Sequence, residues 1–249
     1  GRRRLAKLEM LRAARRLRYS ERGGNVPTVG TGERSHIRRT DSTVKLHTTT
    51  TGTGPNHVAF VHGLGNDGTV WNELIEIAAT VGRHTFTTVD LRGHGRTDRA
   101  DTYRLDDFAD DLVETLPVGL DGIVSHSLGG AVVARAVERL LPQRAVYLDP
   151  GWKLALPDRG LGGVLVRRAR WSILLFAALG SRGIRRPVLT EERAAVEEAS
   201  KARWDRKMAL SVLQDVGQHP LAIGRPPVDS TVLLSGDAPY VVPDPLPEQ

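Results

Sequence analysis

The stretch from Val124 to Gly130, with the sequence Val-Ser-His-Ser-Leu-Gly-Gly, decides how this chain is expected to fold. A short apolar run ends at Val124, and a helical pattern of small and apolar residues begins at Leu128. A serine at such a strand-to-helix turn, followed two residues later by glycine, is typical of a nucleophile held on a sharp and strained turn. Ser125 stands where the usual Gly-x-Ser-x-Gly pattern has its first glycine, and a glycine-rich helix start behind a buried strand is the alternative interpretation.

Composition indicates a soluble globular protein with one large core. The chain has 249 residues, of which 40% are hydrophobic and 26% charged. It has no cysteine, which excludes disulfides and thiolate metal sites. The longest apolar run, residues 171–179, is about half as long as a helix that spans a bilayer. We therefore expect a cytoplasmic protein without a transmembrane segment, a metal or a cofactor.

The formal net charge of +6 is concentrated near the start of the chain. Residues 1–22 have the pattern of a basic amphipathic helix, and a Gly-, Pro- and Thr-rich linker follows, so that residues 1–34 are predicted to be a basic arm and linker. Such an arm could contact anionic lipid or nucleic acid. A solvated extension is the more common role, and we expect no nucleic-acid partner.

Short apolar runs alternate with amphipathic helices along the rest of the chain. The expected strands are residues 35–39, 44–48, 58–61, 85–89, 123–124, 145–148 and 231–234. Helices are expected after Trp71, over residues 103–116 and from Leu128 onward. This alternation predicts a parallel sheet covered on both faces, in a domain of residues 35–249. Residues 152–205 break the rhythm and are predicted to form a helical insertion.

Three motifs at the ends of successive strands resemble those of the α/β-hydrolase family. Residues 62–65 read His-Gly-Leu-Gly, residues 90–95 read Asp-Leu-Arg-Gly-His-Gly, and residues 125–129 read Ser-His-Ser-Leu-Gly. The resemblance covers roughly residues 35–245. It implies a mostly parallel, doubly wound sheet with a helical lid insertion. It also implies a serine hydrolase that cleaves a small or medium apolar ester, lactone or related acyl compound.

The resemblance carries roles to individual residues. Ser127 would be the nucleophile, and the backbone N–H groups of Leu64 and Leu128 would form the oxyanion hole. His62 and His94 would be structural, with His62 bonding the loops beneath the oxyanion site. The acid would be Asp149, after the strand that follows the turn, or Asp237, after the next strand; we prefer Asp149.

The lid would cover an apolar pocket, although plain helix packing explains the same residues equally well. Its expected lining is Trp152, Trp171, Leu174, Leu175, Phe176 and Trp204. His126 is expected to pack or to line this pocket beside the nucleophile. Asp90 and Arg92 are expected to fix loops through ion pairs.

The catalytic histidine of the resembled family follows its last strand, yet no histidine follows His219 here. The chain is therefore predicted to be C-terminally incomplete or to have lost catalysis, and to be a weak or inactive enzyme as written. A non-catalytic member that binds a ligand or partner through the same pocket is the alternative. The oligomeric state is left open.

Overall fold

The computed structural model of the protein describes residues 15–18, 43–80, 82–152, 191–205, 207–209, 211–212, 215 and 226–234. Within this part of the chain a seven-stranded sheet has the order β1-β7-β6-β5-β3-β4-β2. Its strands are β1 (Arg15–Arg18), β2 (His47–Thr51), β3 (Asn56–Val61), β4 (His84–Asp90), β5 (Gly122–His126), β6 (Arg144–Leu148) and β7 (Asp229–Leu234). The helical elements are η1 (Gly68–Trp71), α2 (Asn72–Ala79), α3 (Leu105–Thr115), α4 (Leu128–Leu140) and α7 (Glu191–Ala202).

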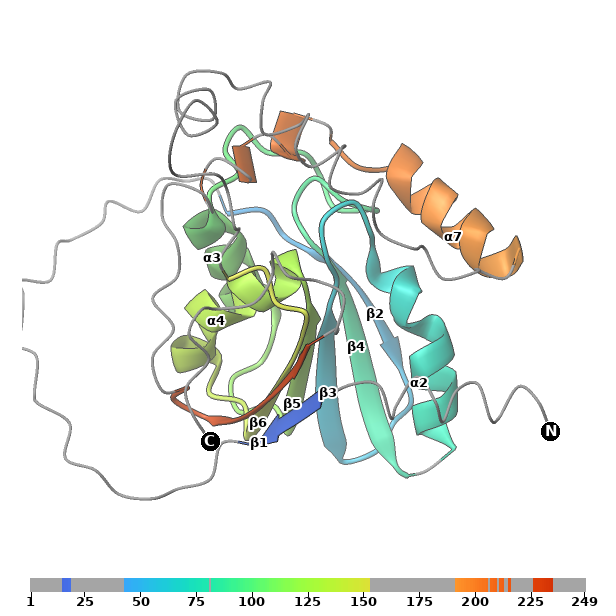
Figure 1. Ribbon diagram of the computed structural model, residues 1–249, viewed down its shortest axis with the longest axis vertical. Coiled ribbons are helices and arrows are strands. Elements are labelled where there is room, and N and C mark those ends of the chain that lie inside the picture. Colours follow the sequence, from blue (N-terminus) through green and yellow to red (C-terminus); the bar gives the residue numbers. More distant parts are fainter. Residues whose placement is uncertain are drawn as a thin grey trace, which may run out of the picture.

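The five central strands, from β7 through β6, β5 and β3 to β4, run parallel to one another. The outer strands β2 and β1 pair antiparallel with β4 and β7. Helices α3 and α4 cover one face of the sheet and α2 covers the other (Figure 1). The expectation of a mostly parallel sheet wound on both faces is therefore confirmed.

Each face of the sheet has its own apolar core, because side chains alternate along a strand. On the α3 and α4 side the core contains Val61, Phe108 and Ile123. On the α2 side it is a smaller cluster in which Phe60 packs with Trp71 at 5.4 Å between ring centroids. The predicted helical stripe over residues 103–116 is confirmed as α3, whose apolar face is buried.

The basic arm departs from the sequence prediction in the residues that the structure describes. Arg15–Arg18 form the edge strand β1, not part of a helix, and pair with Thr231–Leu234. An open sheet edge offers a row of unpaired N–H and C=O groups, and satisfying them outweighs a helical pattern whose intrinsic preference is weak. Residues 1–14 and 19–34, like the predicted strand 35–39, lie outside the described residues.

Strand β2 and the insertion also refine the predictions. Strand β2 spans residues 47–51, three residues later than the predicted 44–48, because its register follows its partner β4. Helix α7, Glu191–Ala202, lies within the predicted helical insertion of residues 152–205. Residues 153–190 of the predicted lid insertion lie outside the described part of the chain.

A buried ion pair connects three separate segments of the domain. Arg92 follows β4, and its fully buried guanidinium donates to both carboxylate oxygens of Asp111 in α3, at 2.6 and 2.7 Å. It also donates to the carbonyl of Thr102 at 2.9 Å. Asp111 in turn accepts a 2.7 Å hydrogen bond from the N–H of Val44. Burial raises the pKa of Asp111, while the Arg92 charge opposes that rise.

Replacing Asp111 by alanine is expected to lower the free energy of unfolding by about 3–5 kcal/mol, because the buried Arg92 loses its two-oxygen partner and keeps the longer 3.7 Å ion pair with Asp107. The matched control is Asp110→Ala, which removes an exposed ion pair with Arg139 and should cost less than about 1 kcal/mol. Urea denaturation of both variants measures the difference. Equal losses would contradict the role assigned to the buried pair.

Candidate functional site

The described residues of the predicted site lie at the point in the sheet where the strand order reverses. After β3 the chain moves to β4 on one side, and it then returns to β5 on the other side of β3. The loops after β3 and β5 therefore lead to opposite faces, and a crevice at the carboxyl ends of the strands is the usual ligand site of such sheets. The segments that begin at His62 and Ser127 lie at this point.

Ser127 occupies a strained turn between β5 and α4. Its backbone angles are φ 48° and ψ −115°, a region that residues with a side chain rarely adopt. The turn brings helix and strand into close approach, because a Cβ on Gly129 would lie 2.6 Å from the carbonyl oxygens of Val61 and His62. Ser125 is fully buried and donates to the carbonyl of Val146 at 3.2 Å. Small residues are therefore required on both sides of Ser127.

Backbone hydrogen bonds tie this turn to the loop after β6. The N–H of Ser127 donates to Leu148 at 3.0 Å, and its carbonyl accepts from Gly151 at 2.8 Å. Asp149 lies between these two partners, half-buried, with a left-handed φ of 40°. Its N–H donates to Leu233 of β7 at 2.8 Å. Asp149 thus comes from the neighbouring strand end to the same edge as Ser127.

Two buried histidines hold the loop after β3, as the sequence interpretation expected. His62 Nε2 accepts from the N–H of Leu91 at 3.0 Å, so its Nδ1–H donates to the Gly63 carbonyl at 2.8 Å. His94 Nε2 accepts from the N–H of Gly65 at 3.2 Å, and its Nδ1 bonds the Arg92 carbonyl at 3.0 Å. Burial lowers the pKa of His62 to about 4 and that of His94 to about 3, so both rings are neutral.

The loop held in this way faces Ser127. A Cβ on Gly63 would lie 3.1 Å from the Ser127 Cβ and 2.9 Å from the His126 ring, so this glycine leaves room for both side chains. The next N–H along the loop, that of Leu64, has no hydrogen-bond partner among the described residues. The N–H of Leu128, at the N-terminus of α4, likewise lacks one in that part of the chain. Two uncommitted donors therefore flank the turn.

The described residues do not supply a complete set of proton-transfer partners for Ser127. No described residue makes a hydrogen bond with Ser127 Oγ. His126 lies half-buried beside it, and desolvation lowers the pKa of its ring, while the charge of Asp149 acts in the opposite direction. Asp237 and His219 lie outside the described residues, as do the predicted lining residues of positions 171–176.

The remaining predicted residues of the insertion pack tightly. Trp152 is buried against Tyr147 and donates from Nε1 to the Gly130 carbonyl at 3.1 Å. Trp204, two residues after α7, lies over Gly65 and near His94. For Trp152 the packing interpretation is therefore correct.

Contacts that anchor the end of α7 were not predicted from the sequence. Arg203 forms an ion pair with Asp67, whose side chain is buried and caps η1. Tyr103 donates to Asp205 at 3.0 Å, and the N–H of Asp205 donates to the Gly93 carbonyl at 2.8 Å. An Asp before Gly-Thr is a recognisable helix cap, so the role of Asp67 at η1 had a sequence signal. Its partner, 136 positions away, had none.

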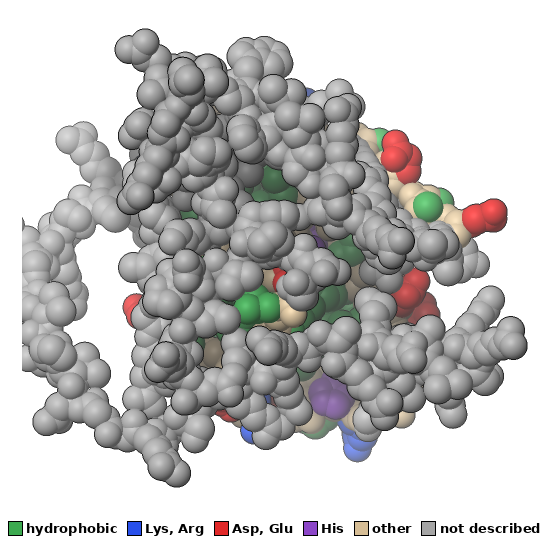
Figure 2. Space-filling view, viewed as in Figure 1, with side chains coloured by type: hydrophobic (Ala, Val, Ile, Leu, Met, Phe, Trp, Pro, Cys, Tyr) green, Lys and Arg blue, Asp and Glu red, His purple; other side chains and the backbone are tan. Residues whose placement is uncertain are grey.

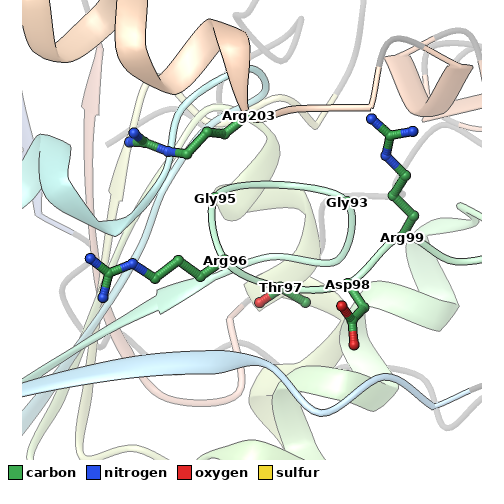
Figure 3. A pocket seen from close by; sticks show the side chains of 7 residues that line it. All are labelled: Gly93, Gly95, Arg96, Thr97, Asp98, Arg99 and Arg203. Carbon is green, nitrogen blue, oxygen red and sulfur yellow. The ribbon is translucent and has the colours of Figure 1, made fainter.

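A polar groove lies beside this anchor, on the loop after β4. It has a volume of about 680 Å³ and is lined by Gly93, Gly95, Arg96, Thr97, Asp98, Arg99 and Arg203. Arg96 and Arg203 extend to one side of the loop and Arg99 to the other (Figure 3). Acidic side chains are exposed along one edge of the molecule (Figure 2). The groove itself is lined by three arginines and one aspartate, so its charge is mostly positive.

The described residues contain no cluster of three or more His, Asp or Glu side chains arranged to hold a metal ion. None of the helices in the same residues is long and apolar enough to cross a membrane.

Comparison with known proteins identifies the family. Residues 58–248 match the Alpha/beta hydrolase family. The chain belongs to this family. It is 35% identical over 119 residues to 2-(acetamidomethylene)succinate hydrolase of Mesorhizobium japonicum, covering 45% of this chain and 42% of that protein. It is 37% identical over 87 residues to non-heme chloroperoxidase CPO-A1 of Kitasatospora aureofaciens, covering 33% and 31%. The matches thus span less than half the length of either relative.

Solved structures of the α/β-hydrolase family share the fold. The esterase of Exiguobacterium antarcticum superposes with a TM-score of 0.54 at 13% identity, covering 69% of each chain. The bromoperoxidase of Bacillus anthracis superposes with a TM-score of 0.53 at 20% identity, also covering 69% of each chain. At these identities the likeness establishes the fold alone.

The strained backbone predicts an unusual response to glycine. Ser127→Gly is expected to unfold with a free energy about 1 kcal/mol higher than that of Ser127→Ala, because glycine adopts a φ of 48° without steric strain. In the middle of α4, Ala134→Gly should instead cost about 1 kcal/mol. Urea denaturation of the three variants tests this, and a Ser127→Gly variant no more stable than Ser127→Ala would argue against strain.

The neutral histidines predict that stability depends on pH. Both have pKa values near 6.5 when unfolded but about 4 and 3 when folded, so the unfolded state binds more protons below pH 6.5. Stability should be full above pH 6.5 and fall by about 1.4 kcal/mol per pH unit for each histidine as the pH drops toward 5. Urea midpoints across this range measure the slope.

His94→Gln should reduce the dependence of the unfolding free energy on pH by the contribution of one histidine, about 1.4 kcal/mol per pH unit. Ile75→Ala, a buried truncation on the opposite face of the sheet, should lower stability equally at every pH. A slope unchanged by His94→Gln would contradict the assignment.

Proposed function

We propose that this protein is a serine hydrolase that cleaves a small or medium apolar ester, lactone or related acyl compound. The observation that carries the proposal is Ser127 on a strained turn that faces Gly63, while the N–H groups of Leu64 and Leu128 have no hydrogen-bond partner among the described residues. In this proposal Ser127 is the nucleophile. The N–H groups of Leu64 and Leu128 receive the charge that develops on the substrate.

The chemistry follows from these positions. Ser127 Oγ attacks the acyl carbon, and the carbonyl oxygen becomes an oxyanion. Donors fixed before the reaction stabilise that charge without reorganisation, and losing one typically costs about 3–4 kcal/mol of transition-state stabilisation. Leu128 adds the positive end of α4, whose N-terminus points at the developing charge.

Attack also requires a base, because serine at its ordinary pKa is a poor nucleophile. In the proposal Asp149 is the acid that orients this base, and Asp237 is the alternative. With an oxyanion hole and binding alone, the expected acceleration is about 10³–10⁴-fold over water. The expected activity is therefore weak if no base acts on Ser127. It reaches that of a complete triad if a base is present.

The names of two relatives favour ester hydrolysis. They are a pimeloyl-[acyl-carrier protein] methyl ester esterase of Sodalis glossinidius and a probable esterase of Oryza sativa. The same fold also occurs in an epoxide hydrolase of Bacillus megaterium, so the fold does not select the reaction. Epoxide and haloalkane chemistry uses a carboxylate nucleophile, and the serine at position 127 favours acyl transfer.

The second candidate is a non-catalytic protein that binds a small molecule or a partner at the same crevice. It is favoured by one observation, that Ser127 Oγ has no hydrogen bond to a described base. Both candidates share the fold and the crevice, and they differ in the reactivity of one oxygen atom.

A fluorophosphonate reagent separates the candidates. It should label the wild-type chain at Ser127 and leave Ser127→Ala unlabelled, as read by mass spectrometry. The matched control is Ser125→Ala, which removes a buried hydroxyl two residues away and should keep the label. Absence of labelling in the wild type would favour the binding protein.

Hydrolysis of p-nitrophenyl acetate then assigns the acid. Asp149→Asn should lower kcat/KM by at least about 100-fold if Asp149 orients the base. Asp237→Asn should have the smaller effect, and the reverse order would transfer the role to Asp237.

A further inference from the structure

We propose that Trp204 is a positioning residue, which holds the loop of residues 63–65 and so couples helix α7 to the oxyanion donor Leu64. The role in catalysis rests on the proposed function, whereas the role in holding the loop does not. Trp204 would act through the backbone of this loop, without touching the reacting atoms.

Trp204 is a close neighbour of Gly65. A Cβ added to Gly65 would be in van der Waals contact with the indole, at 3.8–3.9 Å from three of its atoms, so the indole borders the space beside this glycine. Its ring centroid is 6.5 Å from that of His94, with 33° between the planes. Trp204 thus neighbours both partners of the hydrogen bond from Gly65 N–H to His94 Nε2.

That hydrogen bond fixes one end of the loop. Gly65 has a left-handed φ of 76°, so it is the hinge at which the loop turns away from Ser127. At the other end His62 holds Gly63 and reaches across to Leu91. Leu64 lies between these two fixed points, and the direction of its N–H depends on both. Removing the indole would leave this end of the loop held by two hydrogen bonds of 3.2 Å, from the N–H of Gly65 to His94 and from the N–H of Asn66 to the Gly63 carbonyl.

Trp204 is itself held from both neighbouring positions. Arg203 is paired with the buried carboxylate of Asp67, which also receives hydrogen bonds from Thr69 and caps η1. Asp205 bonds Gly93 through its N–H and Tyr103 through its carboxylate. A displacement of the end of α7 would therefore carry the indole away from Gly65. The insertion between β6 and β7 can set the oxyanion loop in this way.

Hydrogen exchange of the Gly65 amide, followed by NMR, tests the loop role in the full chain. Trp204→Ala should speed this exchange at least tenfold relative to wild type, and Trp204→Phe should keep it within about threefold. Ile75→Ala is the control for lost stability, because it removes a buried side chain on the opposite face. Unchanged exchange in Trp204→Ala, or an equal increase in Ile75→Ala, would overturn the proposal.

Hydrolysis of p-nitrophenyl acetate tests the coupling to catalysis. Trp204→Ala should lower kcat at least tenfold with KM changed less than threefold, and Trp204→Phe should restore most of kcat. A raised KM with unchanged kcat would overturn the proposal, because it would make Trp204 a substrate-binding residue. An inactive wild type would defeat the proposed function and the catalytic coupling, while the exchange measurement would still decide whether Trp204 holds the loop.

Discussion

The strained backbone at Ser127 is the constraint on which the arrangement of this site depends. A φ of 48° at a residue with a side chain persists only when the surroundings compensate for its cost. Here the compensation comes from hydrogen bonds to Leu148 and Gly151 and from the close seating of Gly129 on strand β3. The same contacts draw the loop after β6 and the start of α4 to the carboxyl edge of the sheet. The contacts that hold the strained backbone of Ser127 are therefore the same ones that assemble the candidate site.

Buried polar groups next to this turn hold the neighbouring loops in fixed positions. The neutral rings of His62 and His94 lie 4.9 Å apart and bond the loops after β3 and β4 to each other. Arg92 and Asp111 connect the latter loop to α3 beneath them. Burying any of these groups without a partner costs free energy. Loop positions that break their hydrogen bonds are therefore disfavoured, and the native position is stabilised. These loops are therefore held in place before any ligand binds, and fixed loops are what charge stabilisation in the proposed acyl transfer requires.

Helix α7, which lies within the insertion between β6 and β7, is linked to this rigid base. Its end is anchored by Arg203 and Asp205 on either side of Trp204, and the anchors reach the loops after β3 and β4. Family membership alone leaves the chemistry open, because related folds include esterases, haloperoxidases and epoxide hydrolases. In the proposed function the chemistry depends on Ser127, and its efficiency depends on how firmly the loops around this residue are held.

The sequence by itself determined the strand and helix alternation, the position of Ser127 and the structural character of His62 and His94, because these depend on local patterns of apolar residues and glycines. It failed for Arg15–Arg18, whose strand pairing is decided by the open edge of β7. Only the tertiary structure brought Asp111 to Arg92 and Trp204 to Gly65. These partners are distant in sequence, and the packing of separate elements, which no local pattern encodes, selects them.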